Sequence, residues 1–361
     1  MLDDLRRAVE IETPSRDKSR CDAFVPFFAE LSTAYGARTE RISNPNGGDN
    51  LILRWGSGDS PLVFVGHYDT VWPAGTLARK PFAIEDGVAR GPGILDMKAG
   101  LVQALWAARL LHARSEPRPP SIVFIVNSDE EIGSPSSRAV IEQLAQTARA
   151  VFVFEAPHRG AIKTARKGVG MYTLEVEGRA AHAGVEPEKG VNAIDELARA
   201  TLALHALNDD DAGTTVNVDV VSGGTARNTI AAFARAEIDV RVATKAEARR
   251  IDEAMRAIRP HHPEARIRVS GGLNRPPMER TPKIAELYQR AKQVAAELGF
   301  SLDEVSVGGG SDGNFAAAVG AAVLDGLGAV GEGGHAEHEH IVVDSLAERT
   351  ALAIGVAASL T

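Results

Sequence analysis

The chain has 361 residues, a net charge of −8 at pH 7, 44% apolar residues and a single cysteine, Cys21. This length exceeds one average hydrophobic core, so two domains are expected. The negative charge, with no basic block, argues against a nucleic-acid partner. One cysteine excludes an intramolecular disulfide and a multi-cysteine zinc site. No signal-peptide pattern and no apolar run of the ~20 residues that a membrane span needs are found, so we expect a soluble, cytoplasmic protein without a membrane partner.

Helical and strand patterns alternate over the first part of the chain. Apolar residues recur at helical spacing in 2–11, 21–36 and 97–114. Short runs rich in β-branched residues, typical of buried strands, occupy 50–56, 61–67, 121–131 and 150–157. Apolar strands separated by helices predict an α/β fold with a mostly parallel sheet flanked by helices.

The pattern changes near residue 168. Strand-like alternation at 170–178, 214–224, 234–242 and 265–272 is interleaved with helical patterns at 191–207 and 245–258. This β-α-β-β-α-β order is that of a ferredoxin-like sandwich. A further helix follows at 283–299. We therefore expect one domain built from 1–167 and 281–361, with a smaller α+β domain, 168–280, inserted into it.

Ionisable side chains recur where the expected strands end. The set comprises His67, Asp69, Asp96, Glu130, Glu131, Glu155 and His335. Each has an ordinary explanation by itself, such as a solvated acidic turn. The carboxyl ends of parallel strands open on one edge of a sheet, however, and carboxylates gathered there repel one another without cations. Two histidines with several carboxylates and no thiolate suit a hydrolytic pair of metal ions such as Zn²⁺, Mn²⁺ or Co²⁺.

The segments that carry these residues resemble those of the M20 metallopeptidase family. The motifs are GHYDTV, GPGILDMKAG, NSDEEIGS, VFEAP, GRAAHAG and GGH followed by Glu339, in the family's order. Within that family the sequence is most similar to glutamate carboxypeptidases of the carboxypeptidase G2 type, with acetylornithine deacetylases and succinyl-diaminopimelate desuccinylases more distant. The resemblance implies a zinc-peptidase-like catalytic domain with an inserted lid and dimerisation domain.

The resemblance also implies two Zn²⁺ ions per subunit, for which Co²⁺ or Mn²⁺ may substitute. The implied ligands are His67 and Glu155 on one ion, Glu131 and His335 on the other, and Asp96 between them. Asp69 is expected to orient the His67 imidazole, and Glu130 to be the general base. A cis peptide bond is expected between Asp96 and Met97. His338 and His340 compete with His335, which is preferred because it follows two glycines and precedes Glu339 by four residues.

Further residues are expected to contact the substrate. His182 resembles the family's donor to the oxyanion, supplied by the partner subunit of a homodimer formed through the inserted domain. Arg241 and Asn228 resemble residues that hold the substrate's terminal carboxylate, although Arg241 also suits a solvent-facing strand position. The loop residues Gly309, Gly310 and Ser311 are expected to line the cleft.

Three other features carry less weight. The glycines of 308–313 match a nucleotide-binding pattern, but no acidic residue ends the next strand at the required distance. His261 and His262 lie between prolines and suit a solvated loop. Cys21 opens an amphipathic helix and is expected to pack there.

The favoured interpretation is a zinc-dependent carboxypeptidase that releases a C-terminal amino acid, with glutamate expected, from a small peptide. The alternative is an N-acyl amino-acid deacylase that uses the same metal site. An interpretation from another class, a catalytically silent metal-binding protein, leaves the unliganded acid Glu130 unexplained.

Overall fold

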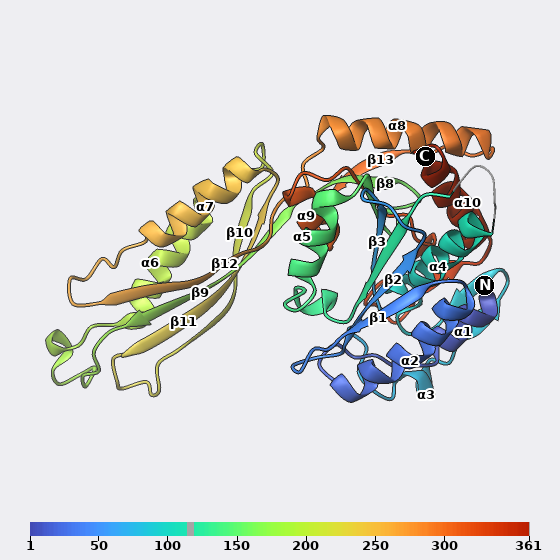
Figure 1. Ribbon diagram of the computed structural model, residues 1–361. Coiled ribbons are helices and arrows are strands. Elements are labelled where there is room, and N and C mark those ends of the chain that lie inside the picture. Colours follow the sequence, from blue (N-terminus) through green and yellow to red (C-terminus); the bar gives the residue numbers. More distant parts are fainter. Residues whose placement is uncertain (114–118, 361) are drawn as a thin grey trace. The chain divides into compact units, whose positions relative to one another are not determined.

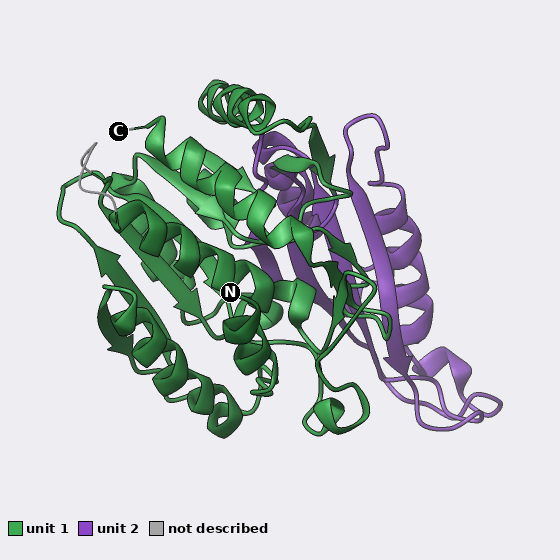
Figure 2. Cartoon of the chain, turned by 90° about the vertical axis from the view of Figure 1, so that its right-hand side faces the viewer, with its two compact units in different colours: residues 1–165, 280–307, 311–361 green, residues 166–279, 308–310 purple. Residues whose placement is uncertain are grey.

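The computed structural model describes residues 1–113 and 119–360, and the chain divides into two compact units. Unit 1 comprises Met1–Ala165, Arg280–Val307 and Ser311–Thr361, and unit 2 comprises Arg166–Glu279 and Gly308–Gly310 (Figure 2). In the described part of the chain, no helix is long and apolar enough to cross a membrane.

Unit 1 contains an eight-stranded sheet with the order β1-β2-β6-β3-β7-β14-β8-β13 (Figure 1). Its strands are β1 (Arg38–Ile42), β2 (Asn50–Trp55), β3 (Leu62–His67), β6 (Ile122–Asn127), β7 (Ala150–Val153), β8 (Ile162–Arg166), β13 (Glu304–Val307) and β14 (Val323–Asp325). The neighbours β6, β3, β7 and β14 run parallel, which confirms the expected parallel centre. The antiparallel pairing of β1, β2 and β8 was not anticipated.

The central strands are apolar along their whole length because both faces of the sheet are covered. Every residue of β3 and β6 is buried. On one face, Phe64 stacks on Phe152 at 5.6 Å between ring centroids and meets Phe154 edge to face at 5.1 Å. This aromatic cluster fixes the spacing of β3 and β7, whose carboxyl ends lead into the segments that carry the acidic residues.

Helices cover both faces of this sheet (Figure 1). The α-helices in the described part of unit 1 are α1 (Leu2–Val9), α2 (Lys18–Ala34), α3 (Thr76–Arg79), α4 (Ala99–His112), α5 (Arg138–Thr147), α8 (Pro282–Glu297), α9 (Gly313–Ala318) and α10 (Asp344–Ala358). The aromatic face is shared by α1, α2, α4, α8 and α10, whereas α5 packs on α9 at the other face. Residue 114, the last of the expected helix 97–114, lies outside the described residues.

A second, small antiparallel sheet in unit 1 joins distant parts of the chain. Its strands are β4 (Ala83–Glu85), β5 (Val88–Arg90), β15 (Gly331–Glu332) and β16 (His340–Val342). β16 pairs with β5. The segment that holds His335 is thereby brought beside the segment that precedes Asp96, an arrangement that the sequence did not suggest.

Unit 2 has an antiparallel sheet with the order β10-β11-β9-β12, and two helices pack on it. The strands are β9 (Gly168–Glu177), β10 (Thr215–Gly223), β11 (Phe233–Val242) and β12 (Arg266–Arg275), and the helices are α6 (Ala193–His205) and α7 (Lys245–Ala257). Alternate residues of β9 and β11 are buried with Leu197 and Ile251 of the helices. This is the expected ferredoxin-like sandwich.

Gly100, in the first turn of α4, packs against backbone, and this contact gives a test of the fold. A Cβ at Gly100 would lie 1.9 Å from the carbonyl oxygen of Phe154. Alanine in a helix is ordinarily more stable than glycine by about 1 kcal/mol. We expect Gly100→Ala to lower the free energy of unfolding by about 1–3 kcal/mol instead, because the sheet and the helix must separate. Thermal unfolding measures the sign; Gly308→Ala, with open space around it, is the control. A stabilised Gly100→Ala variant would contradict the packing described.

Candidate metal centre

Neighbouring strands of unit 1 deliver the acidic and imidazole side chains to one edge of the sheet. His67 is the last residue of β3 and lies opposite Asn127, the last residue of β6, in parallel register. The turn Glu130–Ile132 follows β6, and Glu155 lies two residues beyond the end of β7. Parallel strands end on the same side, so sequence positions far apart converge here.

Asp96 lies between two imidazoles. Its Oδ1 is 3.1 Å from His67 Nε2, and its Oδ2 is 3.1 Å from His335 Nε2. The segment Ile94–Lys98 leaves helical geometry at Asp96 and Met97, and the peptide bond between these two residues is cis, as the resemblance implied. Each carboxylate oxygen of Asp96 therefore faces a different histidine.

Each histidine has a second carboxylate beside it. Glu155 Oε1 lies 3.4 Å from His67 Nε2, and Glu131 Oε2 lies 3.2 Å from His335 Nε2. Ligands of a tetrahedral zinc ion, bound at about 2.0–2.2 Å, stand roughly 3.3 Å apart. The spacing and the donor types thus fit two ions that share Asp96. His67, Glu130 and Glu155 also offer atoms within 4.8 Å of one another, which leaves Glu130 close enough to act at the same site.

Charge explains why these groups need cations. Burial disfavours protonation of His67, but the adjacent carboxylates outweigh it and raise its pKa well above the ordinary value. Hydrogen bonds to Asp96 and Glu131 raise the pKa of His335 to about 10. The two imidazoles in turn overcome burial and hold the pKa of Asp96 far below its ordinary value. The clustered carboxylates are thus the cause of the raised pKa of both histidines.

Asp69 has a wider role in the structure than orienting one ring. The nearest group to His67 Nδ1 is the backbone carbonyl of Asp69 at 3.0 Å, with the carboxylate at 3.4 Å. The buried carboxylate accepts the backbone N–H groups of Glu130 and Glu131 at 3.1 and 3.2 Å. Asp69 therefore connects the His67 strand to the turn that carries both glutamates.

Further buried polar residues hold that turn, and sequence reasoning missed them. Asp129 accepts hydrogen bonds from the backbone N–H of Ser136 and from the Ser137 hydroxyl, each at 2.6 Å. Asp312 accepts one from Asn127 at 2.7 Å. The only signal was the concentration of serine and acidic residues around NSDEEIGSPSS.

His335 is the histidine of its loop that approaches the carboxylates. The structure brings it to Asp96 and Glu131, with the side chain about half exposed. The imidazole of His340 instead contacts the backbone carbonyl of His338 at 2.9 Å, and the ring of His338 packs against Gly333. Among the residues described, the potential metal-binding groups are His67 with Glu130 and Glu155, and His67 with Asp96 and Glu131, so His335 is distinguished from His338 and His340 by its contacts with Asp96 and Glu131 alone.

The expected substrate residues of unit 2 lie at two ends of its sheet. His182 pairs with Thr229 across a short bridge, and the Ala183 N–H donates to the Asn228 carbonyl, so His182 and Asn228 are neighbours. Arg241 lies near the far end of β11 and forms a two-point ion pair with Asp239 at 2.8 Å. At about 3.4 Å per residue, roughly 27 Å of strand separates Arg241 from Phe233, near which Asn228 lies.

The glycine loop has its polar groups engaged. The carbonyl oxygens of Gly309 and Gly310 accept hydrogen bonds from Arg166 at 3.1 and 3.0 Å. Ser311 is fully buried, and its hydroxyl donates to Asp325 at 2.6 Å. The Ser311 N–H is likewise engaged, donating to Asn314 at 2.9 Å.

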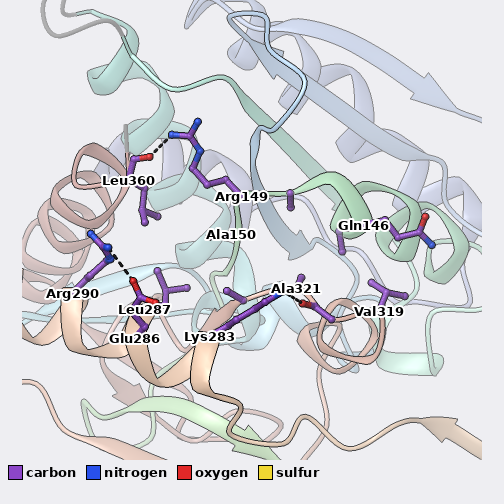
Figure 3. Close-up of a pocket in the computed structure, with 14 residues that line it drawn as sticks. Gln146, Arg149, Ala150, Lys283, Glu286, Leu287, Arg290, Val319, Ala321 and Leu360 are labelled. Carbon is purple, nitrogen blue, oxygen red and sulfur yellow. Dashed lines mark hydrogen bonds and ion pairs between the residues drawn. The ribbon is translucent and has the colours of Figure 1, made fainter.

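Two features of unit 1 stand apart from this centre. Cys21 is buried, which raises the pKa of its thiol to about 12, as expected for a packing residue. A cavity of about 380 Å³ is lined by Arg149, Lys283 and Arg290 among others, but it contains none of the clustered histidines and carboxylates (Figure 3). Arg290 is paired with Glu286, and Arg149 donates to the Leu360 carbonyl.

Comparison with known proteins identifies the family of this chain. Carboxypeptidase G2 of Pseudomonas sp. (strain RS-16) is 32% identical over 97% of this chain and 86% of its own length. Succinyl-diaminopimelate desuccinylase of Dechloromonas aromatica is 30% identical, covering 86% of each chain. The crystal structure of aminopeptidase PepT from Bacillus cereus has the same fold, with a TM-score of 0.81 and 24% identity over 99% of this chain and 97% of that one. A sequence model described as Peptidase family M20/M25/M40 matches residues 63–359, and the chain belongs to this family of metal-dependent hydrolases.

Proposed function

We propose that this protein is a two-zinc carboxypeptidase that releases a C-terminal amino acid, with glutamate preferred, from small peptides. The observation that carries the proposal is the position of Asp96 between two histidines. Its Oδ1 lies 3.1 Å from His67 Nε2, and its Oδ2 lies 3.1 Å from His335 Nε2. Two metal ions bridged by one carboxylate need such an arrangement, in which each oxygen of the carboxylate faces a separate set of imidazole and carboxylate donors.

In this proposal, His67 and Glu155 hold one ion, Glu131 and His335 hold the other, and Asp96 holds both. The ions supply Lewis acidity and lower the pKa of bound water. Zn²⁺ is favoured by the mixture of imidazole and carboxylate donors, and Co²⁺ or Mn²⁺ would fit the same set.

Glu130 is the proposed general base. Glu130 opens the turn after β6 and immediately precedes Glu131. Its backbone N–H donates a hydrogen bond to the Asp69 carboxylate at 3.1 Å. A carboxylate that lies within the same group of side chains as His67 and Glu155, without belonging to either proposed donor set, can take a proton from water and pass it to the departing nitrogen. His182 is the proposed donor to the negative charge that develops on the substrate's carbonyl oxygen.

Unit 2 is the proposed lid and dimerisation domain. β10 is an edge strand of its sheet. Beside it, Ile194, Leu202 and Val221 are 46, 74 and 62% exposed and line an apolar hollow of about 520 Å³. An unpaired edge with a contiguous apolar surface suits a second copy of this chain, with β10 pairing on its equivalent across a two-fold axis.

The separation along β11 supports a composite active site. Arg241 and the pair His182 and Asn228 lie too far apart on one copy of unit 2 to hold the same small substrate. In a dimer, one subunit would supply Arg241 together with the metals, and the partner would supply His182 and Asn228. Arg241 would exchange its two-point contact with Asp239 for the substrate carboxylate, which has the same geometry.

The similarity to a desuccinylase favours one alternative, an N-acyl amino-acid deacylase. Hydrolysis of peptidyl-glutamate, acetyl-amino acids and succinyl-amino acids should be compared in the presence of Zn²⁺. We expect the highest kcat/KM for the peptidyl substrate. A preference for the succinyl or acetyl compounds would favour the deacylase over the carboxypeptidase. If none of these amides is hydrolysed, both proposed activities are wrong.

Substitution of the adjacent glutamates should separate base from ligand. We expect Glu130→Gln to retain its metal and to lose about 10²–10⁴-fold in kcat, the typical contribution of a general base. Glu131→Gln should in addition weaken metal binding, because a ligand is lost. Metal analysis after dialysis, with kinetics on the same preparations, measures both. Loss of metal from Glu130→Gln would reverse the two assignments.

Binding of Zn²⁺ should release protons. A histidine with a pKa near 10, such as His335, is protonated at neutral pH, and only the neutral imidazole binds a metal. Because the proton is displaced, the affinity for Zn²⁺ should rise as the pH rises through the neutral range. Calorimetry in buffers of different ionisation enthalpy counts the protons, and His335→Gln should release fewer. Binding that is independent of both buffer and pH would contradict the proposed ligands.

Mixing two inactive variants should restore activity if the active site is shared. His182→Ala and Glu130→Gln homodimers are each expected to be nearly inactive. After subunit exchange, a mixed dimer has one site with both substitutions and one with neither, so it should approach half of wild-type activity. Val221→Asp, expected to prevent dimerisation, is the control that should abolish this recovery. Mixtures that remain inactive despite proven exchange would mean that His182 serves its own subunit's site, or that the dimer does not form through unit 2.

A further inference from the structure

Glu339 is a buried carboxylate beside the metal centre that fills neither of the proposed donor sets. Its side chain is 1% exposed. Oε2 accepts hydrogen bonds from Trp72 Nε1 at 2.7 Å and from the Gly93 N–H at 2.9 Å. Oε1 accepts from the N–H groups of Leu95 and Asp96 at 2.9 and 3.2 Å. Both oxygens are thus used, and all four of these partners are donors.

These partners belong to the turn that presents Asp96. The segment Ile94–Lys98 departs from helical geometry at Asp96 and Met97. Its first N–H groups therefore need hydrogen-bond acceptors from outside the segment. Glu339 accepts two of them, from Leu95 and from Asp96 itself, and also the N–H of Gly93, the residue before the segment. The carboxylate of Asp96 lies only a few bonds from the nitrogen that Glu339 holds, so its orientation depends on this contact.

Glu339 also lies four residues after His335, in a tight loop. The Glu339 N–H donates to Ala336, and the Ala336 N–H donates to Gly333. His335 has a left-handed backbone conformation, with φ of 65°. The same residue therefore ties the His335 loop to the Asp96 turn, two segments about 240 positions apart in the chain.

The third segment joined by Glu339 is the one that follows His67. Trp72 is 8% exposed, and the ammonium of Lys80 lies 4.0 Å from the centre of its indole ring. A cation on the ring face restrains the indole so that its N–H points at Glu339. Segments that carry three of the proposed ligands, His67, Asp96 and His335, thus meet at one carboxylate.

We propose that Glu339 is a positioning residue that holds the Asp96 carboxylate between the two metal sites. This inference rests on the proposed function only in taking Asp96 as the shared ligand. Carboxylates that orient ligands from outside the coordination sphere commonly affect metal affinity by about 10- to 100-fold when they are altered.

The test is Zn²⁺ affinity of the full-length Glu339→Gln variant, measured by competition with a chromophoric chelator. The amide keeps the size of the side chain but points N–H groups at donors, so Zn²⁺ should bind about 10- to 100-fold more weakly. The absorption spectrum of the Co²⁺-loaded variant should also change, which a merely structural role would not cause. Glu332→Gln, an exposed glutamate of the same small sheet, is the matched control and should behave as wild type.

A second variant keeps the test decisive if Glu339→Gln fails to fold. Trp72→Phe removes one donor and should weaken Zn²⁺ binding several-fold in the same direction. If Glu339→Gln folds, a wild-type Zn²⁺ affinity together with a wild-type Co²⁺ spectrum would overturn the inference. If it does not fold, a wild-type Zn²⁺ affinity of Trp72→Phe would overturn it. Asp96→Asn tests the proposed function separately: if Zn²⁺ binds to it as tightly as to wild type, the shared ligand itself is wrong, whatever Glu339 does.

Discussion

Repulsion among clustered carboxylates is the constraint on which the centre of this molecule depends. Asp69, Asp96, Glu131 and Glu155 gather at one edge of the sheet of unit 1, and none of these side chains is more than 25% exposed. Carboxylates in such surroundings need positive charge close by. The carboxylates raise the pKa of both histidines, which favours the positively charged form of each imidazole. Metal ions would meet the same need with more charge and would free the imidazoles to act as ligands.

Hydrogen bonds to the backbone hold this arrangement where side-chain charges alone would not. Asp69 holds the turn of Glu130 and Glu131, and Glu339 holds the turn of Asp96. Each uses a buried carboxylate to satisfy N–H groups that no regular element satisfies. The acidic residues thus fall into two kinds, those that face the proposed ions and those that fix the segments presenting them. The same residue type serves both because a carboxylate accepts several hydrogen bonds or binds a cation.

The sequence was sufficient to predict the parallel centre of unit 1, the ferredoxin-like unit 2 and the convergence of His67, Asp96, Glu131, Glu155 and His335. The first two features follow from local periodicity. The convergence follows from the rule that parallel strands end at one edge together with the resemblance to the M20 family, which assigned Asp96 and preferred His335 over His338 and His340. It could not predict the small sheet of β4, β5, β15 and β16, whose strands are short and pair over long separations. Nor could it predict that Arg241 pairs with Asp239, or that Ser311 turns inward to Asp325. Such contacts depend on tertiary packing and leave no periodic signal.

The most direct test of the central claim is anomalous diffraction from crystals of the protein prepared with Zn²⁺. The account predicts two zinc positions per chain, about 3.5–4 Å apart, each bound to a different oxygen of Asp96. His67 and Glu155 should lie on one ion, and Glu131 and His335 on the other. A single zinc position at full occupancy, or a pair of ions bridged by Glu130 with Asp96 unbound, would contradict it.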